Sequence, residues 1–219
     1  MRGASIACVF GLNLALLAAQ TPASSNAQTA SQIQTSDLGF TYTVPTDWQI
    51  LTAASTLSGV KDQAQQNAAS DEEKKGVSCV QVALTARHGD PASVLVIVQL
   101  PFDCFGQSMS AKDLPGFAQG ASEGVKQSLD LSSPSNASYK LGSHSMWIQR
   151  SKGSPKGHPE SAYTVETACT VLKKGAVCWM TMAASDDALK VLENSPVELE
   201  GEKPTALVPA TAFEKKPAL

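Results

Sequence analysis

"ACTVLKKGAVCWMTM", from Ala168 to Met182, has the pattern of two β-strands joined by a tight turn, with one cysteine in each strand. If the two lysines at its centre form an even-length loop, Cys169 faces Cys178 and both side chains lie on the apolar face of the hairpin. If Gly175 instead forms a bulge after the turn, the register moves by one residue and the two cysteines point to opposite faces. The turn therefore decides whether these cysteines can bond.

Further hairpins and two helices are predicted around this stretch. Paired strands are expected at Phe40–Val44 with Trp48–Leu51, at Val77–His88 with Ser93–Leu100, and at Tyr163–Leu172 with Ala176–Ala183, and a single strand is expected within Tyr139–Arg150. Asp113 is expected to cap a helix with an apolar stripe, and Ser185 is expected to cap a last helix. Because successive hairpins build antiparallel sheets, we predict an α+β fold, an antiparallel β-sheet with helices packed on its faces.

The two ends of the chain differ in composition from its centre. A positively charged start and the apolar run from Ile6 to Ala19 indicate a signal peptide over residues 1–27, with cleavage between 19 and 27. This run is too short to span a bilayer. We expect a flexible linker over 28–38, a single α+β domain over 39–199 and a loose C-terminal tail over 200–219, because both flanks are polar or mix proline with charges. The mature protein is therefore expected to be periplasmic or extracellular.

Export changes how the cysteines are interpreted. Removal of the signal peptide leaves four of them, Cys79, Cys104, Cys169 and Cys178. In an oxidising compartment an even number favours two disulfides, for which three pairings are possible. Cys79 with Cys104 and Cys169 with Cys178 is the most economical pairing. Because the chain has no Cys-x-x-Cys and no close pair of cysteine and histidine, we expect structural bridges, with no metal and no cofactor.

The stretch "GFTYTVPTDW", which begins at Gly39, resembles the opening of PsbP-like proteins, named for an extrinsic subunit of photosystem II. The predicted order of elements up to Ser195 is similar to their α/β/α sandwich. The combination of "ARHGDPAS", "DLPGFAQG", "SHSMWIQR" and "TVLKKGAVCW" also resembles secreted bacterial proteins of unassigned function. The resemblance implies a non-catalytic accessory or binding module, and no metal-binding or partner-binding residue of the photosynthetic proteins has a matching position in this chain.

Few residues have the types and spacing that chemistry requires. Arg87, His88 and Asp90 supply a cation, a base and an acid within a predicted hairpin end, a composition that a turn alone also explains. His144 shares strand parity with Met146, which predicts a partly buried histidine. No Gly-x-Ser-x-Gly and no glycine-rich phosphate loop is present. We therefore assign no catalytic residue and keep these four positions, 87, 88, 90 and 144, as functional candidates.

Three functions are compatible with this sequence. The favoured one is an exported, non-enzymatic binding or accessory module whose partner is an envelope or extracellular protein or a cell-surface component. A hydrolase using His88 or His144 is an alternative, and a metal or small-ligand carrier is another. With 17 basic and 20 acidic residues, a net charge of −3 and no basic stripe, nucleic acid is not an expected partner. The absence of a later apolar run indicates that the chain is not an integral membrane protein.

Overall fold

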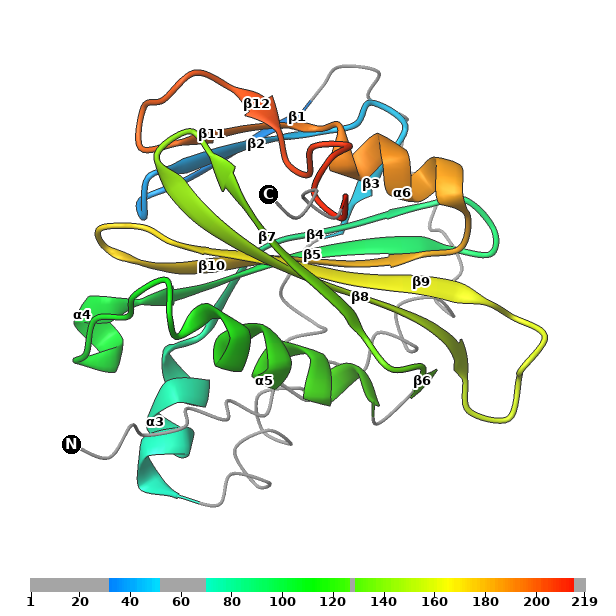
Figure 1. The fold of residues 1–219 in the computed structure, drawn as a ribbon, viewed down its shortest axis with the longest axis horizontal. Helices are drawn as coiled ribbons and strands as arrows, with labels where there is room; N and C mark the ends of the chain where they lie inside the picture. The colour runs from blue at the N-terminus through cyan, green and yellow to red at the C-terminus, as the bar shows by residue number, and fades with distance from the viewer. Residues whose placement is uncertain (1–31, 52–69, 127–128, 215–219) are drawn as a thin grey trace, which may run out of the picture.

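The computed structural model describes residues 32–51, 70–126 and 129–214, and Figure 1 shows their arrangement. The helices are α3 (Asp71–Cys79), α4 (Phe102–Phe105), α5 (Leu114–Lys126) and α6 (Asp186–Glu193). The strands are β1 (Gln32–Ser36), β2 (Phe40–Val44), β3 (Gln49–Ile50), β4 (Gln81–His88), β5 (Ser93–Pro101), β6 (Leu129–Leu131), β7 (Ser135–Leu141), β8 (His144–Pro155), β9 (Tyr163–Val171), β10 (Gly175–Ala183), β11 (Pro196–Leu199) and β12 (Thr205–Ala206). The predicted signal peptide lies outside the described residues. Within the described part, no helix has the length and apolarity needed to cross a membrane.

Two antiparallel sheets and a group of helices are stacked in layers. The main sheet has the order β3-β4-β5-β10-β9-β8-β6, with β7 also beside β8, and the smaller sheet has the order β1-β2-β11-β12. Figure 1 shows the smaller sheet and α6 above the main sheet, and α3, α4 and α5 below it. The fold is thus α+β with antiparallel sheets, as predicted. The layer on one face is a second sheet with one helix, which differs from a layer of helices alone.

Each face of the main sheet contributes to a separate hydrophobic core. Below the sheet, α5 presents the predicted apolar stripe, and Leu114, Phe117 and Val125 are at most 1% exposed. Above the sheet, Phe40 and Trp179 meet edge to face between the two sheets, with ring centroids 5.6 Å apart. Strands β5 and β10 are therefore buried on both faces, which explains why their sequences are continuously apolar.

The hairpin from β9 to β10 has the even-length loop. Leu172 donates its N–H to the carbonyl of Gly175 at 2.8 Å, so Lys173 and Lys174 form a two-residue turn. In this register Cys169 lies directly opposite Cys178, with Cα atoms 4.2 Å apart and the sulfurs bonded. A second disulfide joins Cys79 at the end of α3 to Cys104 in α4. These are the two pairs that the sequence favoured. The bridge between Cys169 and Cys178 lies in the core below the sheet, whereas in the other bridge Cys79 is buried and Cys104 is exposed.

The helix ends differ in how they are capped. Ser185 caps α6 as predicted, accepting the N–H of Ala188 at 3.1 Å. The predicted cap at Asp113 takes another form, because its carboxylate accepts the N–H and the hydroxyl of Ser110, both at 2.8 Å. The main-chain carbonyl of Asp113 instead accepts the N–H of Phe117 at 3.0 Å.

The predicted hairpin at the start of the domain is wrong. β2 pairs with β1 and β11 in the smaller sheet, whereas β3 pairs with β4 in the main sheet. The turn at Pro45 is present, since its carbonyl accepts the N–H of Trp48 at 3.1 Å. Trp48 is 4% exposed and packs between the two sheets, so its burial carries the chain from one sheet to the other.

The predicted domain boundaries also differ from the structure. β1 lies within the expected linker, and its five residues pair with β2. The expected loose tail contains β12 and, after it, the buried residues Leu207, Val208 and Ala212. These segments are ordered by pairing with strands remote in sequence, which their own polar composition does not indicate. The folded unit therefore begins before residue 39 and continues beyond residue 199.

Two predicted strands have different limits. The expected strand from Val77 begins later, because Asp71–Cys79 forms α3 and β4 starts at Gln81. The expected single strand within Tyr139–Arg150 is instead a hairpin, in which Leu141 pairs with His144 across a two-residue turn. Gly142 has a φ of 60° in that turn, a conformation that glycine adopts without strain.

Candidate functional site

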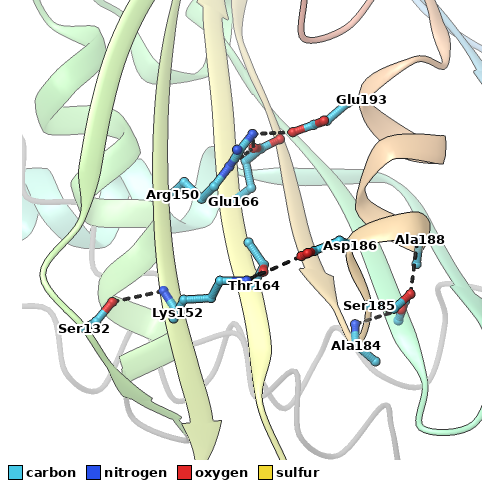
Figure 2. Close-up of polar contacts among 11 residues, drawn as sticks. Ser132, Arg150, Lys152, Thr164, Glu166, Ala184, Ser185, Asp186, Ala188 and Glu193 are labelled. Carbon is cyan, nitrogen blue, oxygen red and sulfur yellow. Dashed lines mark hydrogen bonds and ion pairs between the residues drawn. The ribbon is translucent and has the colours of Figure 1, made fainter. Parts of the chain in front are cut away.

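An arginine and two glutamates meet where β8, β9 and α6 come together (Figure 2). Arg150 on β8 lies opposite Glu166 on β9, and its Nε donates to Glu166 Oε2 at 2.8 Å. Its Nη2 donates to the same oxygen at 2.5 Å and also to Oε1 of Glu193 on α6. The guanidinium carbon lies 4.2 Å from the ring centroid of Phe213, a cation–π contact. One cation therefore connects two strands, a helix and the C-terminal segment.

The carboxylates of this cluster outnumber its cation. Glu166 is 3% exposed, and burial raises its pKa to about 7; the charge of Arg150 opposes that rise and the charge of Glu193 adds to it. Removing a carboxylate from water disfavours its charged form, and a single guanidinium shared with Glu193 does not fully compensate. Glu166 therefore takes up a proton near neutral pH.

Tyr139 of β7 extends the cluster toward the C-terminal segment. Its hydroxyl donates to the carbonyl of Leu207 at 2.6 Å. Burial raises the pKa of Tyr139 far above its usual value, and the negative charges of Glu166 and Glu193 add to the effect. The phenol is therefore a neutral hydrogen-bond donor at every physiological pH, and it holds the start of the segment that follows β12 against β7.

A second set of polar contacts lies at the other end of α6 (Figure 2). Lys152 donates to the hydroxyl of Thr164 at 2.7 Å and is 3.5 Å from a carboxylate oxygen of Asp186. The side chains of Lys152 and Asp186 are 67% and 78% exposed, so this ion pair is of the weak surface kind. Ser93 accepts the N–H of Ala184 at 2.9 Å, which fixes the entrance to α6. These contacts position the helix.

The structure places His88 and Asp90 in one small pocket at the end of β4, with a volume of about 310 Å³. His88 Nδ1 lies 3.1 Å from the main-chain oxygen of Asp47 and 3.4 Å from its carboxylate. The imidazole stacks on Trp48 with ring centroids 5.6 Å apart. Arg87 points elsewhere, because its Nε donates to the side-chain oxygen of Gln49 at 3.3 Å. The three neighbours in sequence therefore do not converge on one point.

The serines of this pocket have structural contacts. Ser93 and Ser185 both line it, and each hydroxyl accepts a backbone N–H at the start of α6. The contacts of the histidine are with Asp47 and Trp48. Ser93 on β5 is the cross-strand partner of His88 on β4, but its hydroxyl is bonded to the N–H of Ala184. In the described part of the chain no hydrogen bond joins His88 to a serine hydroxyl.

His144 lies at a junction of three loops, partly buried as predicted, with 11% of its side chain exposed. Its Nε2 is 3.9 Å from Glu200 and 3.8 Å from Glu202, both in the loop between β11 and β12. Glu200 accepts the N–H of Lys173 at 2.7 Å, and Glu202 accepts the N–H of Ser143 at 3.1 Å. The two glutamates therefore attach the smaller sheet to the turns of two main-sheet hairpins.

The backbone at Glu200 is strained. Its φ of 50° is in the left-handed region that residues with a side chain seldom adopt. Its N–H donates to Gly39 at 2.6 Å, while its carboxylate is held by Lys173. Partial burial raises the pKa of Glu200, but hydrogen bonds from Lys173 and the charges of Lys173 and His144 produce a net lowering. Hydrogen bonds from Ser143 lower the pKa of Glu202.

No group of three or more histidine, cysteine, aspartate or glutamate side chains in the described part of the chain is placed to hold a metal ion. The side chains of Glu200 and Glu202 around His144 connect loops through hydrogen bonds to Lys173 and Ser143.

A groove with a volume of about 970 Å³ lies beside β7. One wall is formed by residues 136–140 of β7, and the other by residues of the segment 209–214. Phe213, which contacts Arg150, lines this groove, and so does Tyr139, whose pKa is raised further by the charges of Glu166 and Glu193. The cluster thus fixes the position of the C-terminal wall relative to the strand. None of the candidates from the sequence, at positions 87, 88, 90 and 144, lines it.

No family model matches the chain, and no curated protein matches it. Among solved structures, cyanobacterial PsbP (CyanoP) from Synechocystis sp. PCC 6803 is similar, with a TM-score of 0.40 and 14% sequence identity. The similarity covers 78% of this chain and 92% of that chain. A similarity of this extent assigns neither an activity nor a partner, so the site is interpreted from its own geometry.

The sequence contained one signal for the charge cluster. Glu166 interrupts "YTVETACTV", a strand that is otherwise apolar or threonine, and a charged residue in such a run needs a partner. Arg150 and Glu193 are 16 and 27 residues away from it, so only the fold identifies them as the partners. The groove has no such signal, because the sequence pattern around Gly142 is that of one continuous strand, whereas the groove lies beside β7, which ends at the turn formed by Gly142 and Ser143.

Proposed function

We propose that this chain is an exported binding module that docks an envelope or extracellular protein in the groove beside β7. The observation that carries the proposal is the groove itself, about 970 Å³ between an edge strand and an anchored C-terminal segment. Such a cavity has the size of a ligand site, and it opens along a strand rather than around a reactive side chain. The proposed export rests on the apolar start of the sequence and fits the two disulfides.

The groove favours a protein over a charged polymer. Its lining includes a single cation, Lys140, and a single anion, Glu214. The remaining lining residues are neutral, and they include the rings of Tyr139 and Phe213. Aromatic side chains are enriched and most charged side chains depleted at the buried centre of protein interfaces, whereas nucleic acid requires several cations. A largely uncharged protein segment therefore matches this surface.

A photo-crosslinking residue in place of Thr211 tests the proposal in the native envelope. Thr211 is exposed and forms part of the C-terminal wall. Lys156, exposed in the loop after β8 and outside the groove, is the matched control position. The proposal predicts a discrete adduct with another protein from position 211 and none from position 156. The same adducts from both positions, or none from either, would contradict it.

The hydrolase alternative has a separate test. We expect His88→Ala and His144→Ala to leave the adduct from position 211 unchanged, because neither residue lines the groove. The purified protein is expected to show no turnover of esterase, peptidase or glycosidase substrates above a denatured control. Saturable turnover that one of these substitutions abolishes, with the thermal melt unchanged, would make that histidine a general base and contradict the proposal.

A further inference from the structure

β7 is a long edge strand with one neighbour. It has seven residues and pairs with β8. The other terminal strands of the described sheets are shorter, with five residues in β1, two in β3, three in β6 and two in β12. On the opposite side of the main sheet, β4 also has an irregular register between Val82 and Leu84. Short edges and bulges prevent unwanted strand pairing, and β7 has neither protection.

The direction of the backbone groups of β7 follows from the register across three hairpins. Leu172 and Gly175 form a hydrogen-bonded pair. Cys169 and Cys178 are the third pair along the ladder from it, so by alternation this pair is non-hydrogen-bonded, which fits its Cα separation of 4.2 Å. The alternation continues through β9 and β8. It makes Leu141 and His144 a hydrogen-bonded pair, so the backbone N–H and C=O groups of Leu141 point toward β8. A two-residue turn closes on such a pair, which gives the same result independently.

The remaining residues of β7 therefore direct their N–H and C=O groups away from β8. These residues are Asn136, Ser138 and Lys140, and all three line the groove and are exposed. The backbone hydrogen bonds of the described residues include none to these outward groups. Three donors and three acceptors thus face the groove at alternate positions along the strand.

The side chains on each face of β7 indicate what a neighbouring strand would contact. Ala137 and Tyr139 lie on the side of the core between the sheets, and Phe213 packs on that same side. Asn136, Ser138 and Lys140 lie on the other, exposed side. A strand added beside β7 would therefore place alternate side chains against the aromatic wall and the others in solvent.

We propose that β7 accepts an extended segment of the partner protein as an additional strand. The segment pairs with the outward backbone groups of Asn136, Ser138 and Lys140, and it carries apolar residues at every second position and no net charge. At about 3.4 Å per residue, the seven residues of β7 match a segment of about 24 Å. This mode of recognition rests on the proposed function, and it specifies the partner as a segment without fixed structure of its own.

A pair of substitutions at Ser138 separates strand addition from other contacts in the groove. Ser138→Pro removes the outward N–H and places a ring where the added strand would lie, and proline is tolerated on an edge strand whose N–H faces solvent. Ser138→Ala retains the N–H and removes the hydroxyl. Thermal melts of both variants establish that the fold is kept.

The probe is a displayed library of random peptides about as long as β7, selected against the purified protein. We expect enriched peptides with alternating apolar residues, which bind the Ser138→Ala variant within about twofold of wild type. The Ser138→Pro variant should bind them about tenfold more weakly, since strand pairing is lost at the centre of the site. Absence of enrichment, or equal binding by the proline variant, would overturn strand addition.

The same variants and peptides distinguish two other segments that could pair with the edge of β7. If wild type is a dimer in sedimentation and the Ser138→Pro variant is a monomer, a second copy occupies the strand and the proposal is wrong. If peptides bind only after removal of residues 215–219, the chain's own end occupies it and the proposal is also wrong. A specific adduct from position 211 that persists in the proline variant would keep the binding function and reject this mode alone.

Discussion

Arg150 and Glu166 lie directly opposite each other on β8 and β9, and the guanidinium that joins them also contacts Glu193 and the ring of Phe213. The pair therefore does more than join two strands. It fixes α6 and the C-terminal segment to the main sheet at the side of the groove. We infer that the shape of the groove depends on a buried cluster in which two carboxylates share one cation.

Removing the cation should destabilise the fold strongly. In Arg150→Ala the buried carboxylate of Glu166 loses its partner, so we expect the free energy of unfolding to fall by about 3 kcal/mol. Lys152→Ala is the matched control, since Lys152 lies two residues along β8 and reaches the same helix through an exposed pair. The free energy of unfolding of the Lys152→Ala variant should fall by less than about 0.5 kcal/mol. Equal losses in the two variants, measured by chemical denaturation, would contradict the role given to Arg150.

The raised pKa of Glu166 gives stability a definite dependence on pH. Between its ordinary value of 4.5 and the folded value of about 7, the folded protein holds a proton that the unfolded chain has released. Stability is therefore lost as pH rises through this window. Glu166→Gln should remove that loss, so the variant should gain stability relative to wild type from pH 5 to pH 8. Asp186→Asn changes an exposed carboxylate on α6, and the stability of this variant should vary with pH in parallel with that of wild type.

The loop between β11 and β12 should make stability depend on pH in the opposite direction. Hydrogen bonds from Ser143 lower the pKa of Glu202, and hydrogen bonds and charge from Lys173 outweigh burial at Glu200. Stability from such groups is present above the unfolded pKa and is lost as pH falls through the folded one. We expect Glu202→Gln to flatten the decline of the melting temperature below pH 4.5. An unchanged acid limb in this variant would show that Glu202 contributes nothing to the attachment.

The two disulfides can be checked without a structure. Peptide mapping of unreduced protein should give one peptide pair joining Cys79 to Cys104 and another joining Cys169 to Cys178. Removing either bridge by double alanine substitution should lower the free energy of unfolding by about 3 kcal/mol, in the chain-entropy account for loops of these lengths. A peptide joining Cys104 to Cys178 would contradict the register of β9 and β10, and four free thiols would contradict both bridges.

Local patterns predicted the central hairpin and the main helix correctly. The two lysines between Cys169 and Cys178 set the register, and the apolar stripe of α5 is buried as its spacing indicated. The second sheet could not be predicted, because β1 and β12 are short and polar and are ordered by pairing with strands far away in sequence. The groove was missed for a related reason. Gly142 and Ser143 were placed within a single strand, and without that turn β7 does not exist as an edge.

Amide hydrogen exchange along β7 tests the central claim most directly. In the free protein, the amides of Asn136, Ser138 and Lys140 should exchange quickly, while those of Ala137 and Tyr139, bonded to β8, should exchange slowly. Addition of a peptide selected for binding should slow exchange at the three outward positions and leave the others unchanged. Uniform exchange along β7 in the free protein, or no added protection at Ser138 with the peptide bound, would contradict strand addition in the groove.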